Sequence, residues 1–285
     1  MRVLYFHQYF GTPRGAGGTR SYEMAQRLIQ AGHEVTMVCG RKDRAISGLN
    51  GPFRRGRREG VIDGITIIEL DLPYANHNNF LRRTWTFIRF AVRSVGVSLT
   101  HHYDVVFATT TPLTAAIPGI AARWIRRKPF VFEVRDLWPE LPIAVGALRN
   151  PLAKAAARWL ERFAYKNADH IVALSPGMKA GIMRSTATTC GVTVIPNSAD
   201  LDLFDPENAD RYRFREDRPE IGNGPLVVYT GTLGRINGVG YLARIAAHAR
   251  DRDSSINFVV VGQGMESEQV RKQAADLGVL GHNFY

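Results

Sequence analysis

Cysteines are scarce in this sequence, and acidic residues are few for the number of basic ones. Cys39 and Cys190 are the only cysteines and lack the spacing of metal ligands. We therefore predict neither a disulfide framework nor a zinc site, and we expect the protein to lie in a reducing compartment. No apolar run is long enough to span a membrane, and the amino terminus lacks a signal-peptide pattern. We therefore expect a cytoplasmic protein, peripheral at most to the cytoplasmic face of the membrane.

The shortage of acids leaves a formal net charge of +11 and a pI of about 10.0 over 285 residues. This charge predicts an anionic partner, which could be phosphates, nucleic acid or an acidic membrane surface. The sequence has no zinc knuckle and no paired-aromatic RNA-binding motif, so we expect no nucleic-acid partner. With 45% hydrophobic residues, the chain has enough apolar content for about two globular domains.

Strand and helix patterns alternate along the chain, which predicts an α/β fold of parallel sheets with right-handed crossovers. The predicted strands are residues 2–7, 34–39, 64–70, 103–108, 130–134, 170–174, 192–195, 226–229 and 256–261. The predicted helices are residues 19–30, 80–99, 112–125, 151–168, 239–249 and 266–277. Residues 40–60 are basic with little apolar content, and we predict a mobile loop there.

The stretch 192–206, VTVIPNSADLDLFDP, predicts a domain boundary. Its β-branched start is typical of a buried strand, Pro196 cannot continue a sheet ladder, and a polar stretch follows. We predict two Rossmann-like lobes, 1–205 and 206–285, with a ligand cleft between them. A plain surface loop within one domain is the alternative. The second lobe has two strand–helix units, where such sheets usually have about five or six strands, so we expect it to be incomplete.

Two glycine loops each follow a predicted strand and precede a predicted helix. Glycines let the backbone approach a ligand, and a helix N-terminus offers free N–H groups to an anion. We expect the two loops to bind a diphosphate, with simple turn glycines as the alternative. The candidate residues are Gly17 and Gly18 in the first loop and Gly231, Thr232, Arg235 and Asn237 in the second. The first loop lacks the third glycine of the dinucleotide fingerprint, because Arg20 stands there.

Charged residues also follow the predicted strand 130–134, in the segment RDLWPE. Charges at the carboxyl end of a parallel strand lie where such sheets bind ligands. Asp136 is our candidate for contact with an acceptor hydroxyl or a reacting group, with Arg135 beside it and Glu140 as a weaker candidate. The alternative is that Arg135 and Asp136 only pair with their neighbours.

Together these segments resemble the family 4 glycosyltransferases of the GT-B fold. The resemblance is carried by VIPNSADLDLF, YTGTLGRINGVGYL and FVVVGQGMESEQV, by the glycine loop ahead of Thr19 and Arg20, and by RDLWPE. RDLWPE is most similar to members that build bacterial surface polysaccharides. The resemblance implies that a nucleotide diphospho-sugar donates its sugar to an acceptor that is often lipid-linked. It also implies retained anomeric configuration, no cofactor and usually no metal.

Three departures from the family pattern matter. Many members have arginine and lysine at the positions of Thr232 and Asn237 to neutralise the donor diphosphate, and we expect Arg235 to supply that charge here. Many members have histidine where this chain has Arg135. The family's paired glutamates follow FVVVGQGMESEQV, but the sequence ends at Tyr285, so we expect a weak or inactive transferase.

Two alternatives of other classes follow from the same residues. A binding-only protein fits the missing glutamates, and an NADP oxidoreductase would place Arg41 and Lys42 on a ribose phosphate, although the missing glycine disfavours it. Asp200 and Asp202 resemble the metal-binding DxD of another glycosyltransferase fold. Because they stand in a linker, we predict that they cap a turn and that no metal binds.

The predicted helix 80–99 is amphipathic and has no acidic residue. Its apolar stripe consists of Leu81, Trp85, Ile88, Val92, Val95 and Leu99, and its arginines are Arg82, Arg83, Arg89 and Arg93. Cationic and aromatic residues on one helix suit the interface of an anionic leaflet, so this helix is our candidate for membrane and acceptor contact. The alternative is that the apolar stripe packs on the first sheet and the arginines are solvated.

Overall fold

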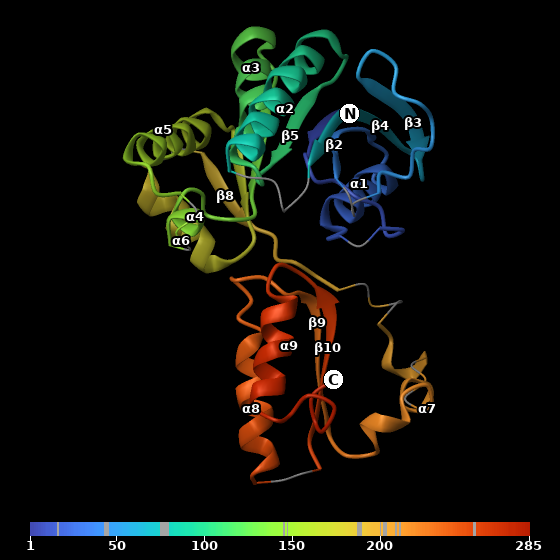
Figure 1. Ribbon diagram of the computed structural model, residues 1–285. Coiled ribbons are helices and arrows are strands. Elements are labelled where there is room, and N and C mark those ends of the chain that lie inside the picture. The colour runs from blue at the N-terminus through green and yellow to red at the C-terminus, as the bar shows by residue number, and fades with distance from the viewer. Residues whose placement is uncertain are drawn as a thin grey trace. The chain divides into compact units, whose positions relative to one another are not determined.

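The computed structural model divides the chain into two compact units, Met1–Asn197 and Ser198–Tyr285. It describes residues 1–15, 17–42, 46–74, 80–144, 146, 148–186, 190–199, 201, 204–208, 210, 212–252 and 255–285. The division falls inside the stretch 192–206, a few residues before the predicted boundary at 205/206. Each unit is an α/β structure with its own core (Figure 1).

The first unit is built on an eight-stranded sheet of order β3-β4-β2-β1-β5-β6-β7-β8. Its strands are β1 (Arg2–Phe6), β2 (Glu34–Lys42), β3 (Arg57–Ile62), β4 (Ile65–Tyr74), β5 (Val105–Thr109), β6 (Phe130–Val134), β7 (His170–Ala173) and β8 (Gly191–Val194). Neighbouring strands pair in parallel, except that β3 pairs antiparallel with β4. In this register Phe6 lies opposite Ala108, and Ala108 opposite Phe132, so β1, β5 and β6 end side by side.

The prediction of a mobile loop over residues 40–60 is wrong in part, because β2 continues to Lys42 and β3 begins at Arg57. Arg54 and Arg57 exchange both backbone hydrogen bonds, at 2.8 and 3.1 Å. Arg55 and Gly56 between them have φ of 50° and 78°, the signs of a type I′ hairpin turn. Strand β3 alternates exposed and half-buried residues. An edge strand of this kind needs little apolar content, so hydrophobicity did not reveal it.

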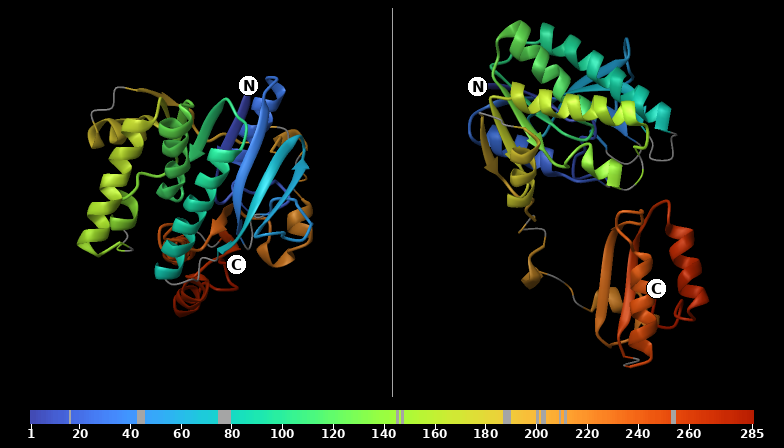
Figure 2. Two further views of the ribbon diagram at one scale, coloured as in Figure 1. Left: turned by 90° about the horizontal axis from the view of Figure 1, so that it is seen from above. Right: turned by 90° about the vertical axis from the view of Figure 1, so that its left-hand side faces the viewer.

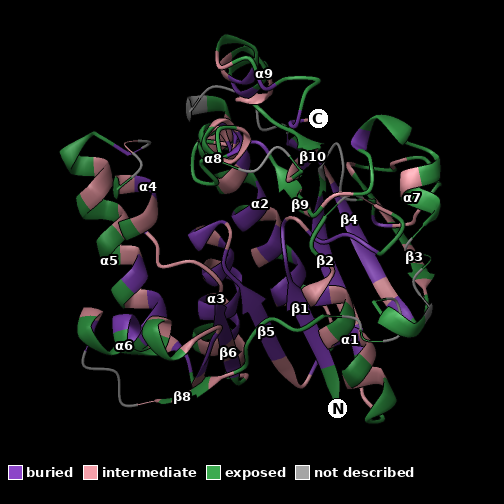
Figure 3. Ribbon diagram, turned by 90° about the horizontal axis from the view of Figure 1, so that it is seen from below, coloured by how far each residue is buried: buried purple, intermediate pink, exposed green. Residues whose placement is uncertain are grey.

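Helices cover both faces of the first sheet. They are α1 (Arg20–Gln30), α2 (Phe80–Thr100), the 3₁₀ turn η1 (Leu113–Ala115), α3 (Ala116–Arg126), α4 (Glu140–Ala144), α5 (Pro151–Asn167) and α6 (Pro176–Ser185). Alternate residues of β1 point to opposite faces. Val3 and Tyr5 join the core under α1, while Leu4 and Phe6 join the core under α2, α3 and α5. Figures 2 and 3 show helices on the two faces of this sheet.

The sequence patterns do not predict α4 or α6. Helix α4 has only five residues, which is too short for an apolar period to show. Helix α6 contains two glycines, which lower helix propensity. It is started by Ser175, whose side chain accepts a hydrogen bond from the backbone N–H of Met178 at 3.1 Å, with Pro176 at the first helical position.

Helix α2 leaves part of its predicted apolar stripe exposed. Trp85, Ile88 and Val92 are 60%, 43% and 65% exposed. The buried face is formed instead by Thr86, Phe90, Ala91, Ser94, Val97 and Ser98. Its polar members fit there in part because Thr86 Oγ1 donates to Arg82 O and Ser98 Oγ donates to Val95 O. The alternative in which the stripe covers the sheet is therefore wrong for these three residues, whereas Val95 and Leu99 are half-buried.

The second unit contains a parallel pair of strands, β9 (Leu226–Thr232) and β10 (Asn257–Gln263). Its helices are α8 (Gly240–Arg250), α9 (Ser267–Asp276), the short α7 (Arg213–Glu216) and the 3₁₀ turns η2 (Pro206–Asn208) and η3 (Pro219–Ile221). Leu233, Val239, Ala243, Phe258, Val270 and Phe284 are among the residues of its core. Asn283 secures the last turn, because its Nδ2 donates to Ala246 O at 3.0 Å.

Candidate functional site

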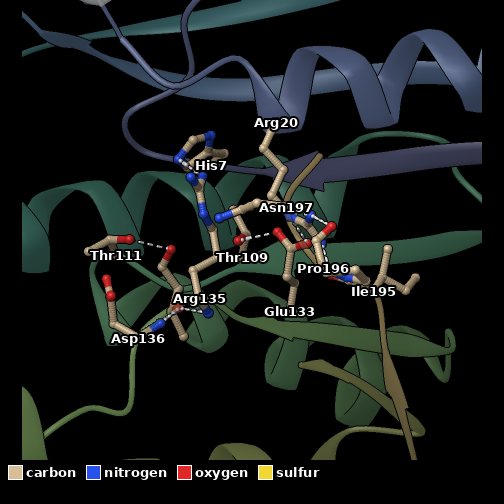
Figure 4. Close-up of polar contacts among 11 residues, drawn as sticks. His7, Arg20, Thr109, Thr111, Glu133, Arg135, Asp136, Ile195, Pro196 and Asn197 are labelled. Carbon is tan, nitrogen blue, oxygen red and sulfur yellow. Dashed lines mark hydrogen bonds and ion pairs between the residues drawn. The ribbon is translucent and has the colours of Figure 1, made fainter. Parts of the chain in front are cut away.

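Polar residues follow three adjacent strands at the carboxyl edge of the first sheet. His7 and Gln8 come after β1, Thr110 after β5, and Arg135 and Asp136 after β6. Figure 4 shows that the side chains of His7 and Arg135 point toward one another there. The sequence placed Arg135 and Asp136 at this edge, and the structure adds residues from the two neighbouring strands.

Thr110 fixes the backbone that leaves β6. Its Oγ1 accepts hydrogen bonds from Arg135 N at 2.7 Å and from Asp136 N at 3.4 Å. Its own N–H donates to Glu133 O at 2.9 Å. One hydroxyl thus satisfies two N–H groups past the end of the strand and holds the backbone from which Arg135 and Asp136 project.

The guanidinium of Arg135 lies against the glycine loop that precedes α1. Its Nη1 is 3.4 Å from His7 Nε2. A Cβ added at Gly18 would lie 3.7 Å from its Nη2. The structure therefore brings together Gly18 and Arg135, two of the predicted site residues, and adds His7. Exposed backbone at Gly17 and Gly18 beside a cation suits an anionic group.

Asp136 and Glu140 stand in different surroundings. Burial raises the pKa of Asp136, and the neighbouring Arg135 opposes part of that rise. Glu140 is the exposed first residue of α4. Burial raises the pKa of Glu161 on α5, and Glu140 adds to the rise, so Glu140 lies near α5. Among the residues described, no polar contact joins Glu140 to Asp136 or Arg135.

Sequence reasoning missed Gln8, whose side chain is almost fully buried behind the same edge, with 1% of the residue exposed. Its backbone C=O accepts from Gly40 N at 3.0 Å. Within the described part of the chain, neither polar atom of its carboxamide has a hydrogen-bond partner. A polar pair directly after a buried strand is the sequence signal that could have identified His7 and Gln8.

A second, more deeply buried cluster joins α1, β5 and β6 to the end of the unit. Arg20 donates from Nε to Glu133 Oε1 at 2.9 Å, and Glu133 Oε2 also accepts from Thr109 Oγ1 at 2.6 Å. The other guanidinium nitrogens of Arg20 donate to Ile195 O and Pro196 O, both at 2.7 Å. Because Glu133 is fully buried, Arg20 both neutralises its charge and fixes the segment that leaves the first unit.

The second unit carries the other predicted loop, between β9 and α8. Gly231 and Thr232 are the last residues of β9, and Arg235 and Asn237 are exposed beyond it. The loop is held by local backbone bonds, such as Asn237 N to Gly234 O at 2.9 Å. Arg235 makes no hydrogen bond or ion pair with any described residue, so its charge is available to a ligand.

The ends of β9 and β10, with the residues that follow them, approach each other backbone to backbone. A Cβ at Gly262 would lie 1.8 Å from Gly231 O, and one at Gly264 would lie 2.0 Å from Leu233 O. No side chain fits at either glycine without moving the partner loop. The glycines of VVVGQG are thus required by packing within this unit, a role that the sequence alone did not indicate.

The residues predicted for membrane and acceptor contact are spread along α2. Arg82, Trp85 and Arg89 are exposed. Arg83 lies over the ring of Tyr74, with 5.7 Å from its Cζ to the ring centroid, and Arg93 Nη1 donates to Gly56 O at 2.9 Å. Arg83 and Arg93 thus contact the elements flanking α2, and the exposed arginines lie beside the apolar stripe.

Asp200 and Asp202 lie outside the described residues. Within the described ranges, no group of three or more His, Cys, Asp or Glu side chains is arranged to hold a metal ion. Over the same ranges, no helix combines the length and apolar content needed to cross a bilayer.

Comparison with known proteins matches this chain to a glycosyltransferase family and to individual glycosyltransferases. The profile of a family described as "Glycosyl transferase 4-like domain" matches residues 15–198. The chain is 26% identical to the putative colanic acid biosynthesis glycosyl transferase WcaI of Escherichia coli K12, over 100% of this chain and 71% of that protein.

Solved structures share the fold. A sucrose-phosphate synthase from Thermosynechococcus elongatus superposes with a TM-score of 0.72 at 16% identity, over 100% of this chain and 69% of that one. Anabaena Alr3699/HepE, solved in complex with UDP-glucose, superposes with a TM-score of 0.61 at 16% identity, over 100% and 68%. These likenesses show that the α/β architecture is of the GT-B type.

Proposed function

We propose a specific transfer reaction for this chain, which belongs to the glycosyl transferase 4-like family and is a glycosyltransferase of the GT-B type. In this reaction a sugar moves, with its anomeric configuration retained, from a nucleotide diphospho-sugar to a lipid-linked saccharide. The proposed role is in surface polysaccharide synthesis. The observation that carries this proposal is the family match across the first unit. That match includes the edge where Gly18, Arg135 and Asp136 lie together. The similarity to WcaI, named for colanic acid biosynthesis, supports the polysaccharide role.

Arg235 is our candidate for the charge that binds the donor in the second unit. When a sugar leaves a nucleotide diphosphate, negative charge develops on the diphosphate, so a fixed cation there stabilises the transition state more than the ground state. Arg235 is exposed and has no partner among the described residues. The backbone at Gly231, the Thr232 hydroxyl and the Asn237 amide are uncharged donors for the same group.

In the first unit we assign contact with the acceptor hydroxyl or the reacting sugar to Asp136. Burial raises the pKa of Asp136, which suits a carboxyl group that accepts or shares a proton with an acceptor hydroxyl. Arg135, Gly17 and Gly18 offer a cation and exposed N–H groups to an anionic part of a substrate. Glu140 remains the weaker candidate, since it lies near α5. The resemblance implies that no metal is needed, so EDTA should leave the rate unchanged.

A lipid-linked acceptor would require this protein to work at the cytoplasmic face of a membrane. The exposed stripe of Trp85, Ile88 and Val92 supports that part of the proposal, because tryptophan and aliphatic side chains on a cationic helix suit the bilayer interface.

The test has a binding stage and a turnover stage. Separate titrations with UDP and with NADP should show saturable binding of UDP and none of NADP. The opposite result, saturable binding of NADP and none of UDP, would favour the oxidoreductase alternative. Turnover is followed by UDP release from UDP-sugars in the presence of a lipid-linked saccharide. NMR of the product should show the anomeric configuration of the donor, and an inverted product would contradict the retaining mechanism. UDP binding without any transfer would favour the binding-only alternative.

A further inference from the structure

A cationic cavity lies beside the hairpin at the start of β3, the edge strand of the first sheet. It has a volume of about 580 Å³ and is lined by Arg54, Arg55 and Arg57. A second cavity of about 270 Å³ shares Arg55 and Arg57 with it and extends to Leu70 on β4 and to Arg93, Gly96 and Thr100 on α2. Among the residues that the structure describes, no acidic residue lines either cavity.

The arginines of this hairpin have few neutralising partners among the described residues. The side chains of Arg54 and Arg55 make no hydrogen bond or ion pair within the described ranges, and both residues are exposed. Arg57 pairs only with Glu59, at 3.0 Å and with both side chains about half exposed. Such a pair adds little stability in water. The hairpin therefore presents three cations that a multiply charged anion could contact together.

Helix α2 holds the hairpin in place. Arg93 Nη1 donates to Gly56 O at 2.9 Å. A Cβ at Gly56 would lie only 2.7 Å from both terminal nitrogens of Arg93. The positive φ favours glycine there, and the hydrogen bond holds the fourth arginine against the turn.

The second cavity lies at the end of the exposed apolar stripe of α2. Trp85, Ile88 and Val92 recur at helical spacing, and the next turn of the helix brings Gly96 to the cavity wall. A cationic pocket at the end of an apolar stripe matches an amphiphile with an anionic head and an apolar tail. Free phosphate or a nucleic acid would leave the stripe without a role.

We propose that the cavity lined by Arg54, Arg55 and Arg57 binds the phosphate headgroup of an anionic membrane lipid, while the α2 stripe enters the bilayer interface. The inference deepens the lipid-acceptor part of the proposed function and rests on it. Its test uses vesicles without donor or acceptor, so a failure of transfer and a failure of lipid binding remain separate results.

The experiment is co-sedimentation of the 285-residue chain with phosphatidylcholine vesicles, with and without phosphatidylglycerol. We expect binding to the anionic vesicles alone, weakened by salt. The variant Arg54→Gln/Arg55→Gln/Arg57→Gln should bind on the order of a hundredfold more weakly, because each arginine near an anionic surface contributes about 1 kcal/mol. The matched control Arg244→Gln/Arg252→Gln/Arg271→Gln removes the same charge from exposed positions of the second unit and should bind like wild type.

A second readout tests the apolar stripe. Insertion of Trp85 should shift tryptophan fluorescence to the blue on anionic vesicles, and Trp85→Phe should remove most of that shift while the other three tryptophans remain. The proposal is overturned if the hairpin variant binds like wild type, if the control loses as much, or if neutral vesicles bind equally. Displacement by inorganic phosphate at the same total phosphate concentration would also overturn it, because the ligand would then be a free anion.

Discussion

The two candidate binding regions are built in opposite ways. At the edge of the first sheet, the Arg20–Glu133 pair is buried and joined by hydrogen bonds to elements more than a hundred residues away. In the second unit, the Arg235 loop is exposed and held by local backbone bonds. The first arrangement is rigid and contributes to stability, whereas the second leaves a charge available to a ligand. Substitutions should therefore act on folding in one region and on chemistry in the other.

The largest expected effect on stability is that of Arg20→Ala. It leaves the Glu133 carboxylate buried without its cation, which typically costs about 3–5 kcal/mol. The measurement is urea unfolding of the first-unit transition at neutral pH. The control is Arg2→Ala, which breaks the exposed pair with Asp104 and should cost far less, because exposed ion pairs add little stability in water. Equal losses in the two variants would show that Glu133 is not held as a buried charge.

Arg235→Ala should lower catalysis while leaving stability nearly unchanged. We expect a loss in kcat equivalent to about 2–4 kcal/mol, since the cation acts on charge that develops in the transition state. The free energy of unfolding should change by no more than about 0.5 kcal/mol, as for other exposed positions. Steady-state kinetics with varied donor measures the first quantity and urea unfolding the second. An unchanged kcat would remove Arg235 from the mechanism.

Much of this contrast follows from how far apart the interacting residues are in the sequence. The segment 130–136 was predicted as a strand followed by Arg135 and Asp136, because strand and charges are contiguous. The pairing of Arg20 with Glu133 spans 113 positions, and its bond to Ile195 spans 175, so no local pattern could reveal it. Likewise, periodicity identified α2 but not which of its faces is buried, because that depends on hydroxyls that bond back to the helix.

Thr110→Val tests the rigid edge with a smaller change. It keeps the side-chain shape but removes the oxygen that accepts from Arg135 N, so we expect a loss of about 1 kcal/mol in the free energy of unfolding. Thr110→Ser keeps the oxygen and should lose less. If both variants lose equally, the effect comes from packing rather than from the hydrogen bond.

The smallest expected effect is a change in pH dependence at Asp136. Burial raises its pKa above the ordinary 3.8, so the folded state binds this proton more tightly than the unfolded chain does. Its contribution to stability is therefore present below about pH 4 and is lost as the pH rises through the folded-state pKa. Asp136→Asn should flatten that part of the stability profile, measured by urea unfolding at a series of pH values. An unchanged profile would show that Asp136 is solvated like an ordinary surface carboxyl.

The charged hairpin also has a consequence for self-association. An open parallel sheet exposes unpaired backbone groups at both edges, and such edges template aggregation. Here one edge is β8, with only four residues, and the other is β3, which carries Arg57, Arg58 and Glu59 and pairs in the opposite direction to the rest of the sheet. Charge on one edge and shortness on the other disfavour strand addition from a second copy. The arginines of β3 and its turn thus disfavour self-association of the free protein, and they are also candidate contacts for lipid.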